Sequence, residues 1–180
     1  MRDVKLAPIV SVLLCTVVLF ALPIHCKKSS TAPEVNPPEV PEQTSITLTC
    51  SPSSGGTDTN FTVSISINNS NREIKVFGLE MKFDADILKF RRIEEGNLTE
   101  SWAAVDGNEI RKGILRVGGF TGSGDSISPG STGHIAEVKF RVTGSNFNDG
   151  QQSQISIKSY TDDIATLTPN PAHTTFTLRK

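Results

Sequence analysis

One alternating stretch places the strongest constraint on what this chain can fold into. Apolar residues recur at every second position from Phe77 to Phe83, the spacing that sends side chains to one face of a β-strand. The Asp-Ala-Asp sequence at residues 84–86 favours a turn, because aspartate side chains hydrogen-bond nearby backbone groups. A helix is the alternative, since Leu79, Phe83 and Ile87 are also spaced for one helical face. The turn chemistry favours strand, turn and strand.

The rest of the chain from residue 45 repeats this pattern of short alternating runs between turn-forming clusters. β-Branched residues at period two, separated by breaks rich in Gly, Pro, Asn and Ser, indicate strands. The expected strands are residues 46–50, 61–67, 76–83, 87–93, 102–105, 113–120, 134–142, 154–159 and 174–178. About nine short strands and no convincing helix predict an all-β domain at residues 45–180. We expect an antiparallel β-sandwich with jelly-roll topology.

The N-terminal segment predicts export from the cytoplasm. Basic residues precede an apolar run that ends at Cys26, as in a secretory signal. The sequence before this cysteine resembles a bacterial lipobox, so we interpret residues 1–25 as a lipoprotein-type signal peptide and Cys26 as the lipidated residue. His25 departs from the lipobox pattern, and an uncleaved anchor or an ordinary cleaved signal are the alternatives. Either a lipid or an uncleaved anchor would hold the protein in the cell envelope, on an outer membrane or cell surface facing away from the cytoplasm.

Residues 26–44 predict a proline-rich linker. The segment contains four prolines and very few side chains that a core could bury. Such a composition cannot offset the entropy of ordering the chain. We therefore expect a disordered tether between the membrane and the folded domain.

Composition narrows the possible functions. The chain carries 18 basic and 19 acidic residues, a net charge of −1, without the basic stripe of a nucleic-acid binder. Its three cysteines, Cys15, Cys26 and Cys50, lie too far apart for a metal knuckle and imply no disulfide framework. Cys50 lies on a predicted strand, where a small buried residue is expected and an exposed, reactive thiol is the alternative. We expect a monomer that binds no nucleic acid and needs no cofactor.

The sequence contains no catalytic signature. It has no paired metal-ligating histidines and no Gly-x-Ser-x-Gly elbow. Neighbouring carboxylates on a strand point to opposite faces and cannot act together across a cleft. Asp84, Asp86 and the Asp162-Asp163 pair could hold calcium, but turn capping is the interpretation that we favour. We predict that the protein is not an enzyme and has no metal site.

Two blocks of the sequence resemble the cohesin domain family. Residues 77–90 and 93–98 are similar to the family's hydrophobic strand, its Tyr-Asp-Pro-x-x-Leu segment and its Val-x-x-Gly turn. Residues 113–121 and 134–142 are similar to its Gly-x-Leu-x-Val and Gly-x-Leu-Ala-x-Ile-x-Phe-x-Val block. The resemblance implies a nine-stranded β-sandwich that binds rather than catalyses, related in fold to carbohydrate-binding modules. It also implies a protein partner, since cohesins hold dockerin modules on one sheet face.

This sequence differs from the family pattern at two places. Polar positions that many cohesins carry just before the Tyr-Asp-Pro strand correspond here to Val76 and Gly78, and residues 84–86 replace the family's Asp-Pro. The sequence holds one copy of the domain and no duplicated calcium loop of the dockerin type. The resemblance therefore implies a single docking module rather than a scaffold of repeated cohesins.

Outward-pointing charges form the candidate contact surface. Side chains alternate between the two faces of a strand. If the apolar residues of 77–83 and 136–142 point inward, the charged residues between them point outward. Since the resemblance places these strands near the recognition face, we predict a mixed-charge partner-binding set. Its members are Glu80, Lys82, Arg116, Glu137, Lys139 and Arg141. The alternative is an ordinary solvated sheet face with weak ion pairs.

Three functions remain open from the sequence. The first is docking of a protein partner that bears a dockerin, the second is direct binding of polysaccharide, and the third is a structural role as an envelope lipoprotein. The mixed-charge set favours the first, and the shortage of aromatic residues counts against the second. Trp102 could still stack on a sugar ring, with a place in the core as the alternative.

Overall fold

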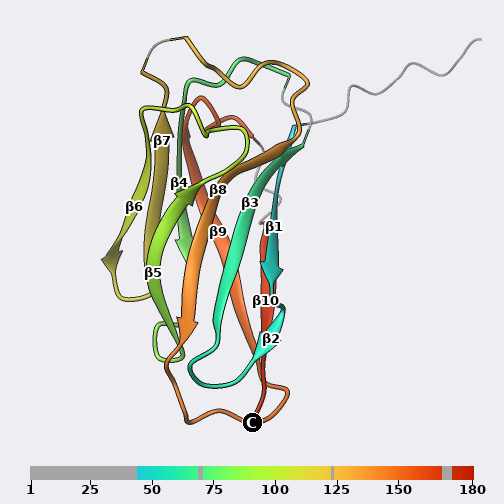
Figure 1. Cartoon of the computed structure of the whole chain (residues 1–180), viewed down its shortest axis with the longest axis vertical. Coiled ribbons are helices and arrows are strands. Elements are labelled where there is room, and N and C mark those ends of the chain that lie inside the picture. The colour runs from blue at the N-terminus through green and yellow to red at the C-terminus, as the bar shows by residue number, and fades with distance from the viewer. Residues whose placement is uncertain (1–43, 69–70, 123, 168–171) are drawn as a thin grey trace, which may run out of the picture. The chain divides into compact units, whose positions relative to one another are not determined.

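Two β-sheets packed face to face make up the folded part of the chain. The computed structural model describes residues 44–68, 71–122, 124–167 and 172–180, and these contain no helix. One sheet has four strands, ordered β1 (Ser45–Ser51), β3 (Asn60–Asn68), β8 (Gly133–Val142) and β5 (Leu88–Glu95). The other has six, ordered β2 (Ser54–Gly55), β10 (His173–Leu178), β9 (Gln152–Asp162), β4 (Val76–Lys82), β7 (Ile114–Phe120) and β6 (Ala104–Arg111). Figure 1 shows the four-stranded sheet in front of the six-stranded one. The all-β sandwich predicted from the sequence is confirmed.

The core lies between the sheets and takes one face of each strand. Phe77, Leu79 and Met81 on β4 are each at most 1% exposed, so the period-two pattern is confirmed and the helical alternative is wrong. Phe140 on β8 contacts an aromatic ring from the facing side, with its centroid 5.1 Å from that of Phe83. Each fully buried side chain of this kind contributes about 1.5–3 kcal/mol of hydrophobic stabilisation.

Aspartates cap the turns, as the sequence predicted. Asp84 Oδ1 accepts a hydrogen bond from the Asp86 backbone N–H at 3.0 Å. Asp163 Oδ2 accepts hydrogen bonds from the backbone N–H groups of Lys75 at 2.8 Å and Val76 at 3.0 Å. Within the described ranges, no three His, Cys, Asp or Glu side chains are arranged to hold a metal ion. These aspartates therefore fix the ends of β4.

Two edge strands were harder to predict. The sequence places a strand at residues 102–105, but β6 begins at Ala104 and continues to Arg111, and Trp102 lies in the turn before it. Most of β6 is exposed, so its sequence shows no apolar alternation. The two-residue β2 pairs in parallel with β10, whereas the other pairings between the named strands are antiparallel. A pairing this short leaves no repeating signal in the sequence.

The predicted signal peptide (1–25), Cys26 and the linker as far as residue 43 lie outside the described residues. In the part that the structure describes, no helix is long and apolar enough to cross a membrane.

Candidate functional site

The six charged residues predicted as one contact surface lie on opposite sides of the sandwich. Glu80, Lys82 and Arg116 belong to the six-stranded sheet, and Glu137, Lys139 and Arg141 belong to the four-stranded sheet. The hydrophobic core separates the two sets, so no flat partner surface contacts both. The prediction of a single surface is wrong, because alternation shows which way a side chain points but not to which sheet its strand belongs.

On the four-stranded sheet the charges already satisfy one another. Lys139 Nζ lies 2.6 Å from Glu137 Oε2 and 2.9 Å from Glu94 Oε2. Partial burial works to lower the pKa of Lys139, but its hydrogen bonds to these two glutamates outweigh burial and raise the pKa. Arg141 pairs with Asp58 at 2.7 Å. Exposed pairs of this kind contribute at most about 1 kcal/mol each, and the pattern fits the solvated-face alternative.

The outer face of the six-stranded sheet carries an exposed apolar pair. Val76 on β4 and Phe120 on β7 are opposite one another in the strand register and are 40% and 50% exposed. Ile110 on the edge strand β6 is also 40% exposed. Among the described residues, these three are the large hydrophobic side chains that are exposed, and all belong to one sheet. Ile110 lies near the other end of β6, so the contiguous apolar patch is the Val76 and Phe120 pair, and a contiguous exposed apolar patch can mark an interaction surface.

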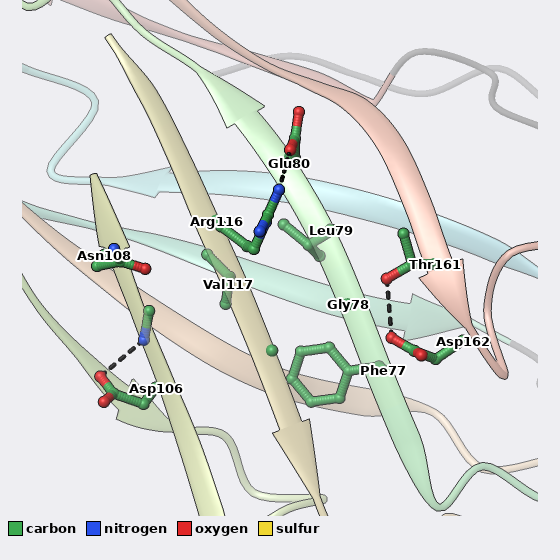
Figure 2. A pocket seen from close by; sticks show the side chains of 12 residues that line it. Phe77, Gly78, Leu79, Glu80, Asp106, Asn108, Arg116, Val117, Thr161 and Asp162 are labelled. Atoms are coloured by element: carbon green, nitrogen blue, oxygen red, sulfur yellow. Dashed lines mark hydrogen bonds and ion pairs between the residues drawn. The ribbon is translucent and has the colours of Figure 1, made fainter. Parts of the chain in front are cut away.

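Next to the apolar pair lies a row with two glycines at its centre. The register aligns Asp106 on β6, Gly118 on β7, Gly78 on β4 and Thr161 on β9 across the sheet. Gly118 has no side chain, and the Thr161 and Asp162 side chains cover Gly78, so the row borders a shallow depression of about 590 Å³ that is open over Gly118 (Figure 2). We call this depression the glycine hollow.

An ion pair bounds the glycine hollow on the side away from Phe120. Arg116 Nη2 donates a hydrogen bond to Glu80 Oε1 at 2.8 Å, and this bond lowers the pKa of Glu80. Figure 2 shows the guanidinium reaching along the sheet toward Glu80 and away from Gly78. The arginine therefore borders the hollow without filling it. Lys82, two residues further along β4, is exposed and lines a separate depression at the end of the sheet.

Two carboxylates stand on opposite sides of the glycine hollow (Figure 2). Asp106 Oδ1 accepts a hydrogen bond from the Gly107 N–H at 2.7 Å, and Asp162 Oδ2 accepts one from the Thr161 hydroxyl at 2.8 Å. Neither carboxylate forms an ion pair with a described lysine or arginine. The Asp162 and Thr161 side chains also lie over Gly78, since a Cβ there would come within 2.8 Å of Asp162 Oδ2. The rim of the hollow is therefore negatively charged.

The layer beneath the hollow is aromatic. The Phe77 ring lies on the inner side of β4, and its centroid is 5.6 Å from that of Trp102. Trp102 is only 6% exposed, so its ring faces are not available to a sugar. The prediction of sugar stacking by Trp102 is wrong, and the core alternative is correct. Its role is to support the strands below the hollow.

Sequence reasoning missed Asp106, Phe120 and Thr161, and it considered Asp162 only as a turn-capping residue or a calcium ligand. Each lies at an exposed position on a strand of the six-stranded sheet, but Asp106, Phe120 and the adjacent Thr161 and Asp162 come from three different strands, β6, β7 and β9. Their shared signal is the strand register, which aligns them with the glycines only after the sheet is assembled. Alternation placed Gly78 outward on β4 and, through Arg116, Gly118 outward on β7, but it did not show that these two glycines are opposite one another.

The chain matches the family model "Cohesin domain" over residues 46–175. The sixth cohesin of Acetivibrio cellulolyticus scaffoldin B, solved with a Cel5 dockerin, has 20% identity and a TM-score of 0.54, covering 74% of this chain and 97% of that one. The Coh-OlpA-Doc918 complex of Clostridium thermocellum gives 14% identity, a TM-score of 0.60, and coverage of 76% and 99%. A non-cellulosomal cohesin from Archaeoglobus fulgidus gives 16% identity, a TM-score of 0.55, and coverage of 77% and 92%. At these identities the likeness to solved structures concerns the fold, and no curated protein sequence matches this chain.

Proposed function

Because this chain belongs to the cohesin domain family, we propose that it docks a dockerin-bearing protein through the outer face of the six-stranded sheet. Cohesin domains are protein-interaction modules and not enzymes, and two of the similar structures contain dockerins. The observation that carries the choice of face is the exposed Val76 and Phe120 pair beside the glycine hollow.

The two faces of the sandwich differ in the free energy that a partner would gain or lose by covering them. Protein interfaces have a core enriched in aromatic residues and arginine and a polar rim. Phe120 supplies such an anchor, with Arg116 and Asn108 close by on the same sheet. On the four-stranded sheet, a partner would desolvate the linked charges of Lys139, Glu137 and Glu94, a cost that can exceed the electrostatic gain, and no large apolar side chain of the described residues is exposed there to offset it.

Direct binding of polysaccharide receives less support. Sugar-binding surfaces use exposed aromatic rings, and Phe120 is the one large aromatic side chain exposed among the described residues. The polysaccharide function and the structural envelope function are therefore kept as outcomes of the test.

We also propose that the protein is a monomer anchored to a membrane by a lipid on Cys26, facing away from the cytoplasm, with residues 26–44 as a tether. The support is the basic and apolar N-terminal sequence that ends at this cysteine. Labelled palmitate should enter the wild-type chain in its producing cell and not the Cys26→Ser variant. Equal labelling of both proteins would reject lipidation at this residue.

A capture experiment tests the docking function. The full chain is immobilised and offered the extract of its producing cell, and in parallel a panel of insoluble polysaccharides, with calcium or with chelator. We expect retention of a protein that mass spectrometry identifies as dockerin-bearing, and its loss in chelator, since a dockerin needs calcium to fold.

Matched variants assign the face. Phe120→Asp should reduce retention at least roughly tenfold, because it removes a central aromatic anchor, whereas Lys139→Glu on the opposite sheet should leave retention unchanged. Equal loss with both variants, or loss with Lys139→Glu alone, would reject the proposed face. Retention on a glycan with no protein captured would replace docking by sugar binding, and no retention of either kind would favour the structural envelope role.

A further inference from the structure

The glycine hollow has the dimensions of a receptacle for one long side chain. Neighbouring strands lie about 4.8 Å apart, so the missing side chain of Gly118 opens a gap of roughly 10 Å between the flanking strands β6 and β4. The Thr161 and Asp162 side chains over Gly78 close this gap on the β9 side. Along the strands, the gap extends from the Val76 and Phe120 pair to the Glu80 and Arg116 pair, roughly 14 Å at about 3.4 Å per residue. The floor is flat backbone, against which an aliphatic stem can lie.

The charge around the glycine hollow selects the head group of that side chain. Asp106 and Asp162 stand on opposite sides, and neither is paired with a described cation. The adjacent Arg116 is neutralised by Glu80, to which it donates its hydrogen bond. An incoming cation would therefore meet two carboxylates that have unused acceptor capacity.

We propose that the glycine hollow receives a lysine or arginine side chain that the docking partner presents next to an apolar residue, an inference that rests on the proposed docking function. The methylene stem lies on Gly118, beside the side chains that cover Gly78, and the cationic head reaches Asp106 or Asp162. The neighbouring apolar residue of the partner meets Phe120. Long basic side chains divide in this way between apolar and polar surroundings.

Other side chains fit this surface less well. A purely apolar side chain would take Asp106 and Asp162 out of water without pairing them, which is costly. An acidic side chain would face both carboxylates at short range and be repelled. A side chain that combines an apolar stem with a positive head matches both the uncharged backbone below the hollow and the two carboxylates beside it.

Small probes test the hollow without the partner. The full chain, labelled with ¹⁵N and held in detergent micelles, is titrated with N-acetyl-lysine methylamide. N-acetyl-norleucine methylamide, which has an aliphatic side chain but no charge, is the matched probe. We expect the lysine probe to shift the amide signals of Gly78 and Gly118 in a saturable way. It should bind roughly three- to tenfold more tightly than the norleucine probe, the ratio that one or two exposed ion pairs give.

Variants distinguish the contribution of the two aspartates from that of the glycine backbone. Asp106→Asn combined with Asp162→Asn should remove the preference for the lysine probe; asparagine suits position 162, which has a φ of 61°. Gly118→Val should block both probes, and its amide spectrum shows directly whether it remains folded. Glu94→Gln combined with Glu137→Gln, on the opposite sheet, is the control and should keep the preference.

The possible results distinguish this inference from the docking function. Equal binding of the two probes, or shifts that map to the four-stranded sheet, would overturn the assignment of the glycine hollow even if a dockerin-bearing protein is captured. Preferential lysine binding at the hollow, without capture of any such protein, would support the hollow as a cation receptacle and count against the docking function. Persistence of the preference in the double asparagine variant would also overturn the inference.

Discussion

The same substitution at two adjacent glycines of β7 should have unequal consequences for stability. Gly119 faces the core, where a new Cβ would lie 2.7 Å from Phe77 Cε1 and 3.0 Å from Val105 Cγ2. Gly118 faces the glycine hollow, where the nearest atom to a new Cβ is the Phe77 carbonyl oxygen at 3.1 Å. Gly119→Ala must therefore displace packed side chains, and Gly118→Ala needs only a small backbone adjustment.

The expected magnitudes follow from these contacts. Overpacking a filled core costs about 1–3 kcal/mol, and replacing glycine by alanine recovers about 0.4–1 kcal/mol by restricting the unfolded chain. Gly119→Ala should thus lower the free energy of unfolding by about 1–2 kcal/mol. For Gly118→Ala, the cost of the close contact and the stabilisation from restricting the unfolded chain nearly cancel. We therefore expect the free energy of unfolding to change by no more than about 0.5 kcal/mol.

Urea unfolding of the full chain provides the measurement. Trp102 is the only tryptophan in the chain and packs beside Phe77, so its fluorescence reports loss of this part of the core. In a double-mutant cycle, Phe77→Leu should relieve the clash and give a coupling energy of at least about 0.5 kcal/mol with Gly119→Ala. If Gly119→Ala is as stable as Gly118→Ala, or if Phe77→Leu leaves its cost unchanged, the packing argument is refuted.

Three further outcomes are expected. The buried Thr99 hydroxyl accepts a hydrogen bond from the Gly96 N–H at 3.0 Å. Thr99→Val should therefore lower the free energy of unfolding, read from urea midpoints, by about 1–3 kcal/mol, and Thr99→Ser should lower it by less. Equal losses with the two variants would contradict this. The hydrogen bond from Lys139 lowers the pKa of Glu94, so its stabilisation is present above the ordinary pKa of about 4.5 and lost as pH falls through the lowered value. Lys139→Met should flatten the dependence of the urea midpoint between about pH 3 and 6, and an unchanged slope would reject this origin. Burial raises the pKa of Cys50 to about 11. In a variant whose other two cysteines are replaced by serine, the folded protein should react with Ellman's reagent at pH 8 on the order of a hundredfold more slowly than the protein unfolded in urea. Equal reaction rates would show that the thiol is accessible in the folded protein.

Local patterns were sufficient to predict most of the fold. The alternation around Phe77 indicated a strand with a buried face, and the aspartates at residues 84–86 indicated the turn that ends it; both are confirmed. The opposite edge of the sheet was less predictable. Strand β6 has no fully buried side chain and exposes most of its residues, so no buried face imposes a period on its sequence, and only its pairing with β7 reveals where it ends.

The candidate site divides in the same way. Glu80 and Arg116 were predicted to point outward and do so as an ion pair. Lys139 was also predicted to point outward, but it does so from the other sheet. Alternation from Arg116 also turns Phe120 outward, but only the pairing with Val76 shows that it forms an apolar patch.

By itself, the sequence determined the class of fold, the direction of each side chain relative to its own strand, and the family to which the chain is similar. Only the tertiary structure decided that one row contains Asp106, Gly118, Gly78 and Thr161. It also decided that Lys139 lies on the opposite sheet, on the other side of the core. The reason is physical. Alternation is a property of each strand alone, set by backbone geometry over a few residues. Strand neighbours are chosen by contacts between residues that are far apart in the chain, and a hollow exists only after those neighbours meet.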